Sequence, residues 1–235
     1  MKKQALVIHS GGMDSSLCLA LAVKEFGAEN VLSVSFTYNQ RHAVELTRAR
    51  EISEFMKVDH TEINLDCLSQ ITESALIGNT QKIEHKKGSA PNTLVTGRNG
   101  LMARVGAIHA NSLGAHCIYM GVMELEEANS GYRDCSRAYM DIVEQALRMD
   151  FADPKFEIRT PLVKMNKKET MEVSLKLGVL PYLLEKTITC YEGLEKEGCL
   201  KCPACQLRNV GLKIFSLEHP EVQYSYREKI LNLIA

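Results

Sequence analysis

The sequence predicts an α/β protein built on an open, doubly wound parallel sheet, with a small helical appendage near the C-terminus. Short apolar runs alternate with amphipathic stretches of helical length along most of the chain. This β-α-β order implies parallel strands joined by right-handed crossovers. Cysteines gather between Thr187 and Gly211, beyond the alternating region. We therefore divide the 235 residues into an α/β domain at 1–185 and a cysteine-rich region at 186–235 that packs on it.

The first half of the chain predicts a strand, a tight turn and a helix, followed by two more strands around a second helix. The expected strands are 5–9, 31–36 and 60–65, and the expected helices are 15–26 and 43–56. The apolar run of the first strand ends in Ser-Gly-Gly, and apolar residues then recur at helical spacing as far as Gly27. The turn between them therefore joins a strand directly to a helix.

The second half continues the alternation after a long loop. Residues 78–97 lack periodicity and contain several glycines and a proline, and loops of this length are often functional. The expected elements that follow are helix 99–113, strand 116–122, a polar loop at 124–137, helix 138–149, strand 156–159 and helix 167–177. The last helix ends at Gly178, and the cysteine-rich region comes soon afterwards.

The composition limits the classes of function. The chain is 45% hydrophobic and 24% charged with a net charge of -1, as in ordinary globular proteins, and it lacks the basic excess typical of proteins that bind long nucleic acids. No stretch reaches the ~18 apolar residues of a membrane span, so we expect a cytoplasmic protein. In that reducing compartment the eight cysteines favour metal ligation or buried thiols over disulfides.

The turn after the first strand has the features of a phosphate-binding loop. In Ser10-Gly11-Gly12-Met13-Asp14-Ser15, glycines let backbone N–H groups approach an anion at a helix N-terminus, and two hydroxyls add donors. Asp14 has two alternative roles, capping the helix or holding a phosphate-bound Mg2+. No glycine is followed by lysine, which excludes the Walker loop, and G-x-G-x-x-G is missing. The alternative is a turn that merely suits strand-to-helix geometry.

The C-terminal cysteines predict a metal site. Their spacing is C-x8-C-x2-C-x2-C, formed by Cys190, Cys199, Cys202 and Cys205. Four thiolates close a tetrahedral shell around Zn2+ and leave no open position for catalysis, which predicts a structural ion. An iron–sulfur cluster is the competing occupant, and four unligated thiols are the remaining alternative. Three other cysteines occupy apolar positions and are expected to be packing residues, namely Cys18, Cys67 and Cys117.

A series of motifs then resembles one family along nearly the whole chain. The motifs are Ser10 to Ser15, Tyr38-Asn39-Gln40-Arg41-His42, Pro91-Asn92-Thr93, Gly97-Arg98-Asn99, Gly131-Tyr132 with Asp134-Cys135, and Thr189-Cys190-Tyr191 with the later cysteines. In this order they resemble the 7-cyano-7-deazaguanine synthases (the QueC family) of the N-type ATP pyrophosphatase superfamily. The resemblance implies a PP-loop fold like that of the adenine nucleotide alpha hydrolases.

The resemblance also implies an activity and its ligands. The expected reaction converts 7-carboxy-7-deazaguanine and ammonia to 7-cyano-7-deazaguanine through adenylated intermediates, as a ligase step of queuosine biosynthesis. ATP with Mg2+, one structural Zn2+ per subunit and a homodimer are implied, with small-molecule substrates and no nucleic acid or membrane partner. The residues expected to bind ATP are His9, Ser10, Gly11, Gly12, Met13, Asp14, Ser15, Ser16, Leu17, Cys18 and Leu19.

Further residues are candidates for the substrate site. Arg98, Arg41 and Lys167 can clamp phosphate or carboxylate groups, although each is also explained as a solvated surface charge. Tyr132 can stack on the deazaguanine ring and Asp134 can accept hydrogen bonds from its N–H edge. The sequence departs from the family pattern at Arg133, Ser136 and Thr96, and we expect Arg137 to replace the displaced family arginine.

Two other functions fit parts of the sequence. A tRNA thiolation enzyme of the same superfamily needs catalytic cysteines or a sulfur-carrying cluster and a basic RNA surface, and the near-zero net charge argues against it. A repurposed relative that binds nucleotide or handles a deazaguanine differently is compatible with the altered loop at 132–137.

Overall fold

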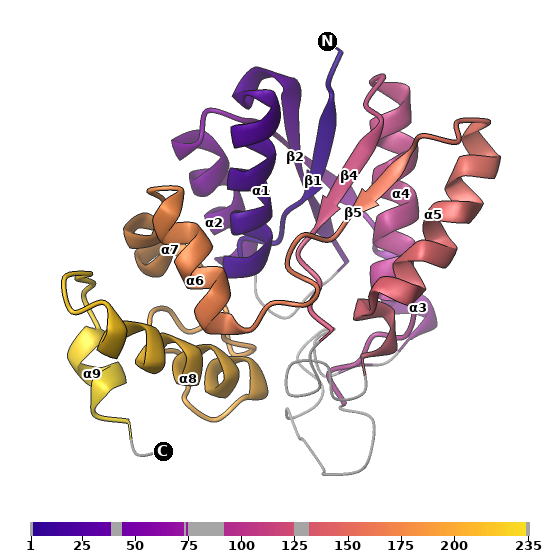
Figure 1. Cartoon of the computed structure of the whole chain (residues 1–235). Helices are drawn as coiled ribbons and strands as arrows, with labels where there is room; N and C mark the ends of the chain where they lie inside the picture. Colours follow the sequence, from indigo (N-terminus) through magenta and orange to yellow (C-terminus); the bar gives the residue numbers. More distant parts are fainter. Residues whose placement is uncertain (1, 39–43, 73, 75–91, 125–131, 234–235) are drawn as a thin grey trace.

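A computed structural model describes residues 2–38, 44–72, 74, 92–124 and 132–233. Its sheet has five strands in the order β3-β2-β1-β4-β5, and every neighbouring pair is parallel (Figure 1). The strands are β1 (Ala5–Ile8), β2 (Val31–Thr37), β3 (Asp59–Asn64), β4 (Cys117–Met120) and β5 (Glu157–Arg159). The expected open, doubly wound parallel sheet is confirmed.

Helices cover both faces of this sheet (Figure 1). One face packs on α1 (Met13–Phe26) and α2 (Val44–Phe55), and the other on α4 (Arg98–Ser112) and α5 (Arg137–Phe151). The side chains of β1 alternate between them, because Ala5 and Val7 join the core beside α1 whereas Leu6 joins the core beside α4. Both faces of the central strands are buried, which explains why the sequences of β1 and β4 are continuously apolar, whereas the edge strands β3 and β5 are partly exposed and contain charged residues.

The C-terminal helices form a third core beside α1. The remaining helices are α3 (Cys67–Ile71), α6 (Lys167–Lys176), α7 (Leu180–Lys186), α8 (Pro203–Glu218) and α9 (Arg227–Leu231), with 3-10 turns η1 (Ala28–Asn30) and η2 (Arg133–Cys135). Phe215 of α8 packs in one cluster with Met171 of α6 and Leu184 of α7. A Cβ atom on Gly211 would lie 2.5 Å from the Cβ of Lys167, so glycine allows α8 to pack closely on the start of α6.

The described residues correct some of the expected details. The phosphate-binding turn enters the helix at Met13 rather than at 15, and the polar loop at 124–137 contains η2. Cys18 and Cys117 are buried as expected, but Cys67 is exposed and the prediction that it packs in the core is wrong. Its short helix α3 buries Leu68 instead. No helix among the described residues is long and apolar enough to cross a membrane.

The sheet topology determines where a ligand can bind. From β1 the chain moves outward to β2 and β3, and it then returns to place β4 on the other side of β1. The strand order therefore reverses between β1 and β4. Open α/β sheets bind ligands in the crevice beyond the carboxyl ends of the strands at such a point. The predicted phosphate loop follows β1 at this crevice.

Candidate functional site

The loop after β1 is held tightly against two distant segments. Gly11 has a positive φ of 79°, and a Cβ atom there would lie 2.2 Å from the carbonyl oxygen of Glu45 in α2. Glycine is therefore required by both conformation and space. On the other side, the N–H of Ile188 donates a hydrogen bond to the carbonyl oxygen of Gly11 at 3.1 Å. The C-terminal region thus contacts the loop directly.

Hydroxyl groups stabilise the bend of this loop. The Ser15 hydroxyl donates to the Gly12 carbonyl oxygen at 3.1 Å, and the Ser10 N–H donates to the Ser15 Oγ at 3.1 Å. The two hydroxyls of Ser10 and Ser15 also lie 3.1 Å apart. Because α1 begins at Met13, the loop presents the N-terminus of a 14-residue helix to the cavity. This arrangement suits an anion.

A buried hydrogen-bond chain supports the loop from below. Ser16 donates its hydroxyl hydrogen to the Gly12 carbonyl oxygen at 2.7 Å, so the Nε2 of His9, 3.0 Å from the Ser16 Oγ, is the donor in that contact. The Nδ1 of His9 then accepts from Ser33 at 3.0 Å, and the Ser33 Oγ lies 2.9 Å from the Nδ1 of His60. Burial, with a smaller contribution from His60, lowers the pKa of His9 to about 3, so its ring is neutral.

A charged pair lies at the mouth of the loop. The Nζ of Lys167 is 2.8 and 2.6 Å from the two carboxylate oxygens of Asp14, and 3.0 Å from the Sδ of Met123. Lys167 is the first residue of α6, where Asn166 and Glu169 form a capping box. Both carboxylate oxygens of Asp14 therefore have a partner on α6.

The crevice beyond β1 and β4 is a cavity of about 380 Å³. Its floor is formed by the phosphate loop and by residues that follow β4. A Cβ atom on Gly121 would lie 2.8 Å from the backbone nitrogen of Ser15, so this glycine lets β4 end directly against the start of α1. The lining residues of the C-terminal region are Ile188, Thr189, Tyr191, Pro203, Ala204 and Leu207. The appendage therefore forms one wall of the cavity.

Arg98 and two tyrosines line another part of the cavity. The guanidinium of Arg98 donates to the hydroxyl of Tyr38 at 3.3 Å and lies 5.9 Å from the centre of its ring. The hydroxyl of Tyr132 forms a hydrogen bond with Thr93. Arg98 is the first residue of α4, so its helix N-terminus faces the same space. Positive charge and aromatic surface are thus brought together in the cavity that the loop lines.

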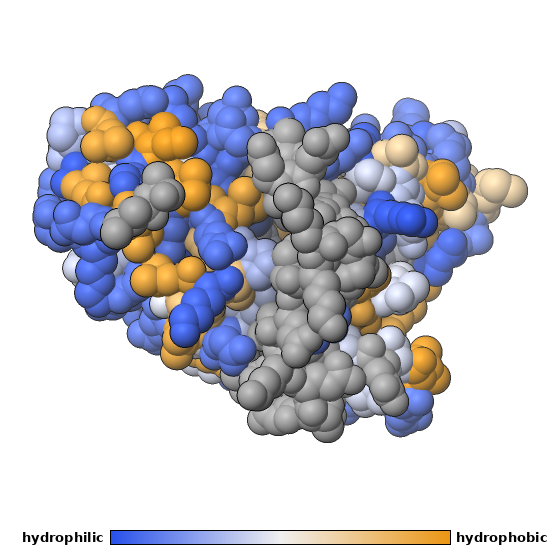
Figure 2. Space-filling view, turned by 90° about the horizontal axis from the view of Figure 1, so that it is seen from below, coloured by the Kyte–Doolittle hydropathy of each residue, from blue (hydrophilic) through white to orange (hydrophobic). Residues whose placement is uncertain are grey.

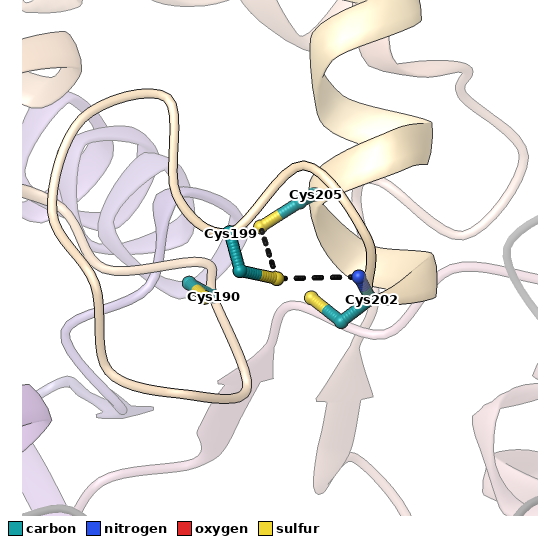
Figure 3. A group of neighbouring side chains, drawn as sticks. All are labelled: Cys190, Cys199, Cys202 and Cys205. Atoms are coloured by element: carbon teal, nitrogen blue, oxygen red, sulfur yellow. Dashed lines mark hydrogen bonds between the residues drawn. The ribbon is translucent and has the colours of Figure 1, made fainter. Parts of the chain in front are cut away.

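The four C-terminal cysteines lie together as expected (Figure 3). Their Sγ atoms are all within 4.8 Å of one another, which allows one metal ion to bind all four. Backbone N–H groups of Lys201 and Cys202 donate to the Sγ of Cys199 at 3.5 and 3.2 Å. A Cβ atom on Gly198 would lie 2.4 Å from the Sγ of Cys205, so glycine is needed beside the sulfur atoms.

Comparison with known proteins gives the family. The model of the family described as queuosine biosynthesis protein QueC matches residues 4–216. The chain belongs to this family. The resemblance predicted from its motifs is confirmed.

Solved structures with similar folds agree with the parallel sheet. An NMN synthetase from Francisella tularensis matches with a TM-score of 0.53 and 16% identity, covering 97% of this chain and 82% of that one. An NH3-dependent NAD synthetase from Campylobacter jejuni matches with a TM-score of 0.51 and 14% identity, covering 100% of this chain and 80% of that one. At these identities the likeness shows the fold alone.

In this QueC chain the residues expected to bind ATP occupy three kinds of position. The cavity is lined by His9, Ser10, Gly12, Met13, Asp14 and Ser15. Gly11 is packed against α2, and Ser16 is bonded to His9. Leu17, Cys18 and Leu19 are buried in the core between α1 and the sheet. Only the first part of the run therefore reaches the cavity directly.

The other candidate residues divide in a similar way. Arg98, Lys167 and Tyr132 line the cavity, whereas Arg41 lies outside the described residues. Asp134 accepts a hydrogen bond at 3.1 Å from the backbone N–H of Asn99 in the first turn of α4. The guanidinium of Arg137 donates to the carbonyl oxygen of Ile158 at 2.5 Å and to Thr160 at 3.0 Å, beside β5. Neither Asp134 nor Arg137 lines the cavity.

Sequence reasoning missed two residues of this site in the QueC chain. Gly121 follows β4 and makes the close approach to the loop described above. Glu45 in the first turn of α2 lines the cavity, and burial raises the pKa of its carboxyl group to about 7, although Arg98 opposes the shift. The signal for both was their place after a parallel strand or at the start of the following helix, where sites of this fold form.

Proposed function

We propose that this chain is an ATP-dependent ligase that converts 7-carboxy-7-deazaguanine and ammonia to 7-cyano-7-deazaguanine through adenylated intermediates, in queuosine biosynthesis. The observation that supports the proposal is the phosphate loop of a QueC family chain at the open end of β1, inside a cavity that also holds Arg98 and Lys167. Such a cavity is large enough to take a nucleotide or a ring-bearing acid.

The chemistry explains why ATP is consumed. The carboxylate oxygen of the substrate is a poor leaving group, and adenylation converts it into a good one. Backbone N–H groups at the start of α1 stabilise the pyrophosphate as it leaves, and the Nζ of Lys167 neutralises part of its charge. Asp14 has the oxygen ligands that Mg2+ prefers, and the ion would shield the phosphate oxygens of bound ATP.

Two rounds of this activation produce the nitrile. Ammonia displaces AMP from the first adenylate to give an amide, and adenylation of the amide oxygen then permits its loss with formation of the C–N triple bond. In this proposal Tyr132 stacks on the deazaguanine ring and Arg98 orients the reacting carboxylate, because both line the same cavity as the loop. One phosphate loop serves both rounds.

The metal in this proposal is Zn2+ with a structural role. Four thiolates within 4.8 Å of one another match a closed tetrahedral site, which leaves no position for a substrate. The ion would fix the loop from Cys190 to Cys205, whose neighbours Thr189, Tyr191 and Pro203 line the cavity. In this proposal the metal supports the reaction indirectly, because it fixes the segment that forms one wall of the cavity.

We extend the proposal to a homodimer. Figure 2 shows apolar residues gathered over the part of the molecule that α8 and α9 form. On α8, the side chains of Val210, Ile214 and Leu217 are 61%, 45% and 66% exposed at helical spacing, which supports contact with a second copy of the chain. Ile214→Glu should therefore convert the dimer to a monomer in sedimentation velocity. A dimer of unchanged stability would remove the support for this surface.

The proposed reaction is tested by incubating the protein with ATP, ammonium and 7-carboxy-7-deazaguanine and identifying products by mass spectrometry. The expected product is the nitrile, with AMP and pyrophosphate released in each round. Omission of ammonium should leave the adenylated acid. Failure to consume the carboxylated deazaguanine contradicts the proposal, and AMP formation that requires tRNA and a sulfur donor instead supports the thiolation alternative.

A further inference from the structure

Glu45 adds a second carboxyl group, besides that of Asp14, to a cavity whose phosphate loop and cationic side chains suit anions. It is in the first turn of α2, and its backbone carbonyl oxygen packs on Gly11 so closely that no side chain fits there. The position of Glu45 is thereby tied to the phosphate loop. Its side chain lines the same cavity as Arg98 and Lys167. A carboxylate at this place repels phosphate groups, so direct contact with phosphate does not explain its presence.

The carboxylate of Glu45 has no partner among the described residues. Neither an ion pair nor a hydrogen bond involves its oxygens there, although Arg98 is near enough to oppose the rise in its pKa. By contrast, Glu51 on the same helix is paired with Arg48 at 2.6 Å. Glu45 is only partly exposed, and a poorly solvated carboxylate is stabilised where a ligand supplies hydrogen-bond donors or positive charge. The Glu45 carboxylate therefore suits a cationic or N–H-rich ligand in the cavity that it lines.

The proposed reaction, on which this inference rests, includes one cationic substrate. Ammonia is present mostly as ammonium near neutral pH, and ammonium must lose a proton before its nitrogen can attack a carbonyl carbon. We propose that the Glu45 carboxylate binds this ammonium ion and accepts the proton that it loses. The carboxylate attracts the cation, and the adjoining phosphate loop holds the adenylate that ammonia attacks.

The electron pairs in this step are accounted for. An N–H bond of ammonium breaks, its electron pair stays on nitrogen, and the proton forms an O–H bond with Glu45. That pair forms the C–N bond to the adenylate carbonyl carbon, and the C–O bond to AMP breaks with its pair leaving on the AMP phosphate. The nitrogen releases its excess proton to water, which leaves the neutral amide. Neither an oxidant nor a reductant is required.

The test compares Glu45→Gln with Glu54→Gln, a control on the exposed side of the same helix. With ATP and the carboxylated deazaguanine saturating, Glu45→Gln should raise the KM for ammonium roughly ten- to a hundredfold, because a hydrogen bond to a charged group is lost. The KM for ATP should stay within about twofold of wild type. Glu54→Gln should change neither value. Metal content and thermal unfolding of both variants establish that the fold is intact.

A second measurement separates nucleophile binding from adenylation. Pyrophosphate–ATP exchange that depends on the carboxylated deazaguanine, without ammonium, should proceed in Glu45→Gln at the wild-type rate. Hydroxylamine, which is uncharged near neutral pH, should be used by the variant almost as well as by wild type, giving the hydroxamate. Rescue by an uncharged nucleophile would not follow from a purely structural role of Glu45.

Three outcomes decide the matter. An unchanged KM for ammonium in Glu45→Gln overturns the inference. If Glu45→Gln raises the KM for the carboxylated deazaguanine but not that for ammonium, the inference is also wrong, because Glu45 then accepts hydrogen bonds from the N–H edge of the ring. If the wild-type protein shows no pyrophosphate–ATP exchange with the carboxylated deazaguanine, the proposed function itself is wrong. If Glu45→Gln retains the exchange and its KM for ammonium is unchanged, only the inference about Glu45 is wrong.

Discussion

At the scale of single residues, the ion pair between Lys167 and Asp14 links the phosphate loop to α6. Asp14→Ala should abolish product formation, because the loop loses the carboxylate that pairs with Lys167 and that we propose as a ligand of Mg2+. It should also lower the free energy of unfolding by ~1–3 kcal/mol, since a largely buried ammonium group is left unpaired. Urea unfolding and a product assay measure the two effects.

A double variant separates the two roles of Asp14. Asp14→Ala combined with Lys167→Met removes the unpaired charge and should recover much of the lost stability, because Met has a similar length and is apolar. It should not recover activity. The metal content should be that of wild type in both variants. Near-normal turnover in Asp14→Ala would be incompatible with the assignment of the loop.

His9 makes the stability of the fold depend on pH. Its folded-state pKa is lowered to about 3 by burial, whereas in the unfolded chain it titrates near ~6.5. Between these two values the unfolded state binds the extra proton, so stability is fully present above pH ~6.5 and falls as pH falls toward 3. The slope from this one group is ~1.4 kcal/mol per pH unit.

A comparison of wild type with His9→Gln separates the pH dependence that comes from His9 from that of the acidic residues. The glutamine amide retains a donor for Ser16 and an acceptor for Ser33 but does not titrate. The difference in unfolding free energy between the two proteins should therefore shrink as pH falls from 6.5. Parallel stability curves over that range would show that His9 is not held neutral.

At the scale of elements, the junction between β1 and α1 depends on glycine. Gly11→Ala places a methyl group against the Glu45 carbonyl oxygen and forces alanine to φ 79°. We expect a loss of ~1–3 kcal/mol from overpacking in addition to ~1–2 kcal/mol of backbone strain. Gly178→Ala is the matched control, because φ is 73° and nothing lies within 4 Å, so only the strain remains. Equal melting temperatures for the two variants would contradict the close packing of the loop.

The order of strands and helices could be predicted because periodicity is a local property of the sequence. The same is true of the cysteine cluster, since all four ligands fall within a short segment. The partner of Asp14 could not be predicted, because Lys164, Lys167 and Lys168 are equivalent in a local pattern and only the packing of α6 selects one. Arg137 was expected in the cavity on its position in the motif, but its side chain reaches β5 instead. Side-chain direction depends on tertiary packing, which the pattern does not contain.

At the scale of the whole molecule, the cysteine cluster adjoins the cavity, because chain neighbours of the cysteines line it. We expect about one zinc per chain by elemental analysis, with no visible absorption of an iron–sulfur cluster. Cys202→Ser should lose the metal, and both the melting temperature and the turnover should fall, because metal binding contributes to folding and Pro203 lines the cavity. Full turnover in metal-free protein would show that the reaction does not require metal at the cysteine cluster. A brown protein would indicate an iron–sulfur cluster instead of zinc.

The contact between Ile188 and Gly11 joins residues that are made at very different times, and this has a consequence for the nascent chain. A ribosome releases the first strands and the phosphate loop early, and domains generally begin to fold as they emerge. The C-terminal residues that line the cavity, from Ile188 to Leu207, emerge much later. A chain that has been made only as far as β5 therefore has the phosphate loop without the wall that covers it, and the cavity becomes complete only after Leu207 has emerged.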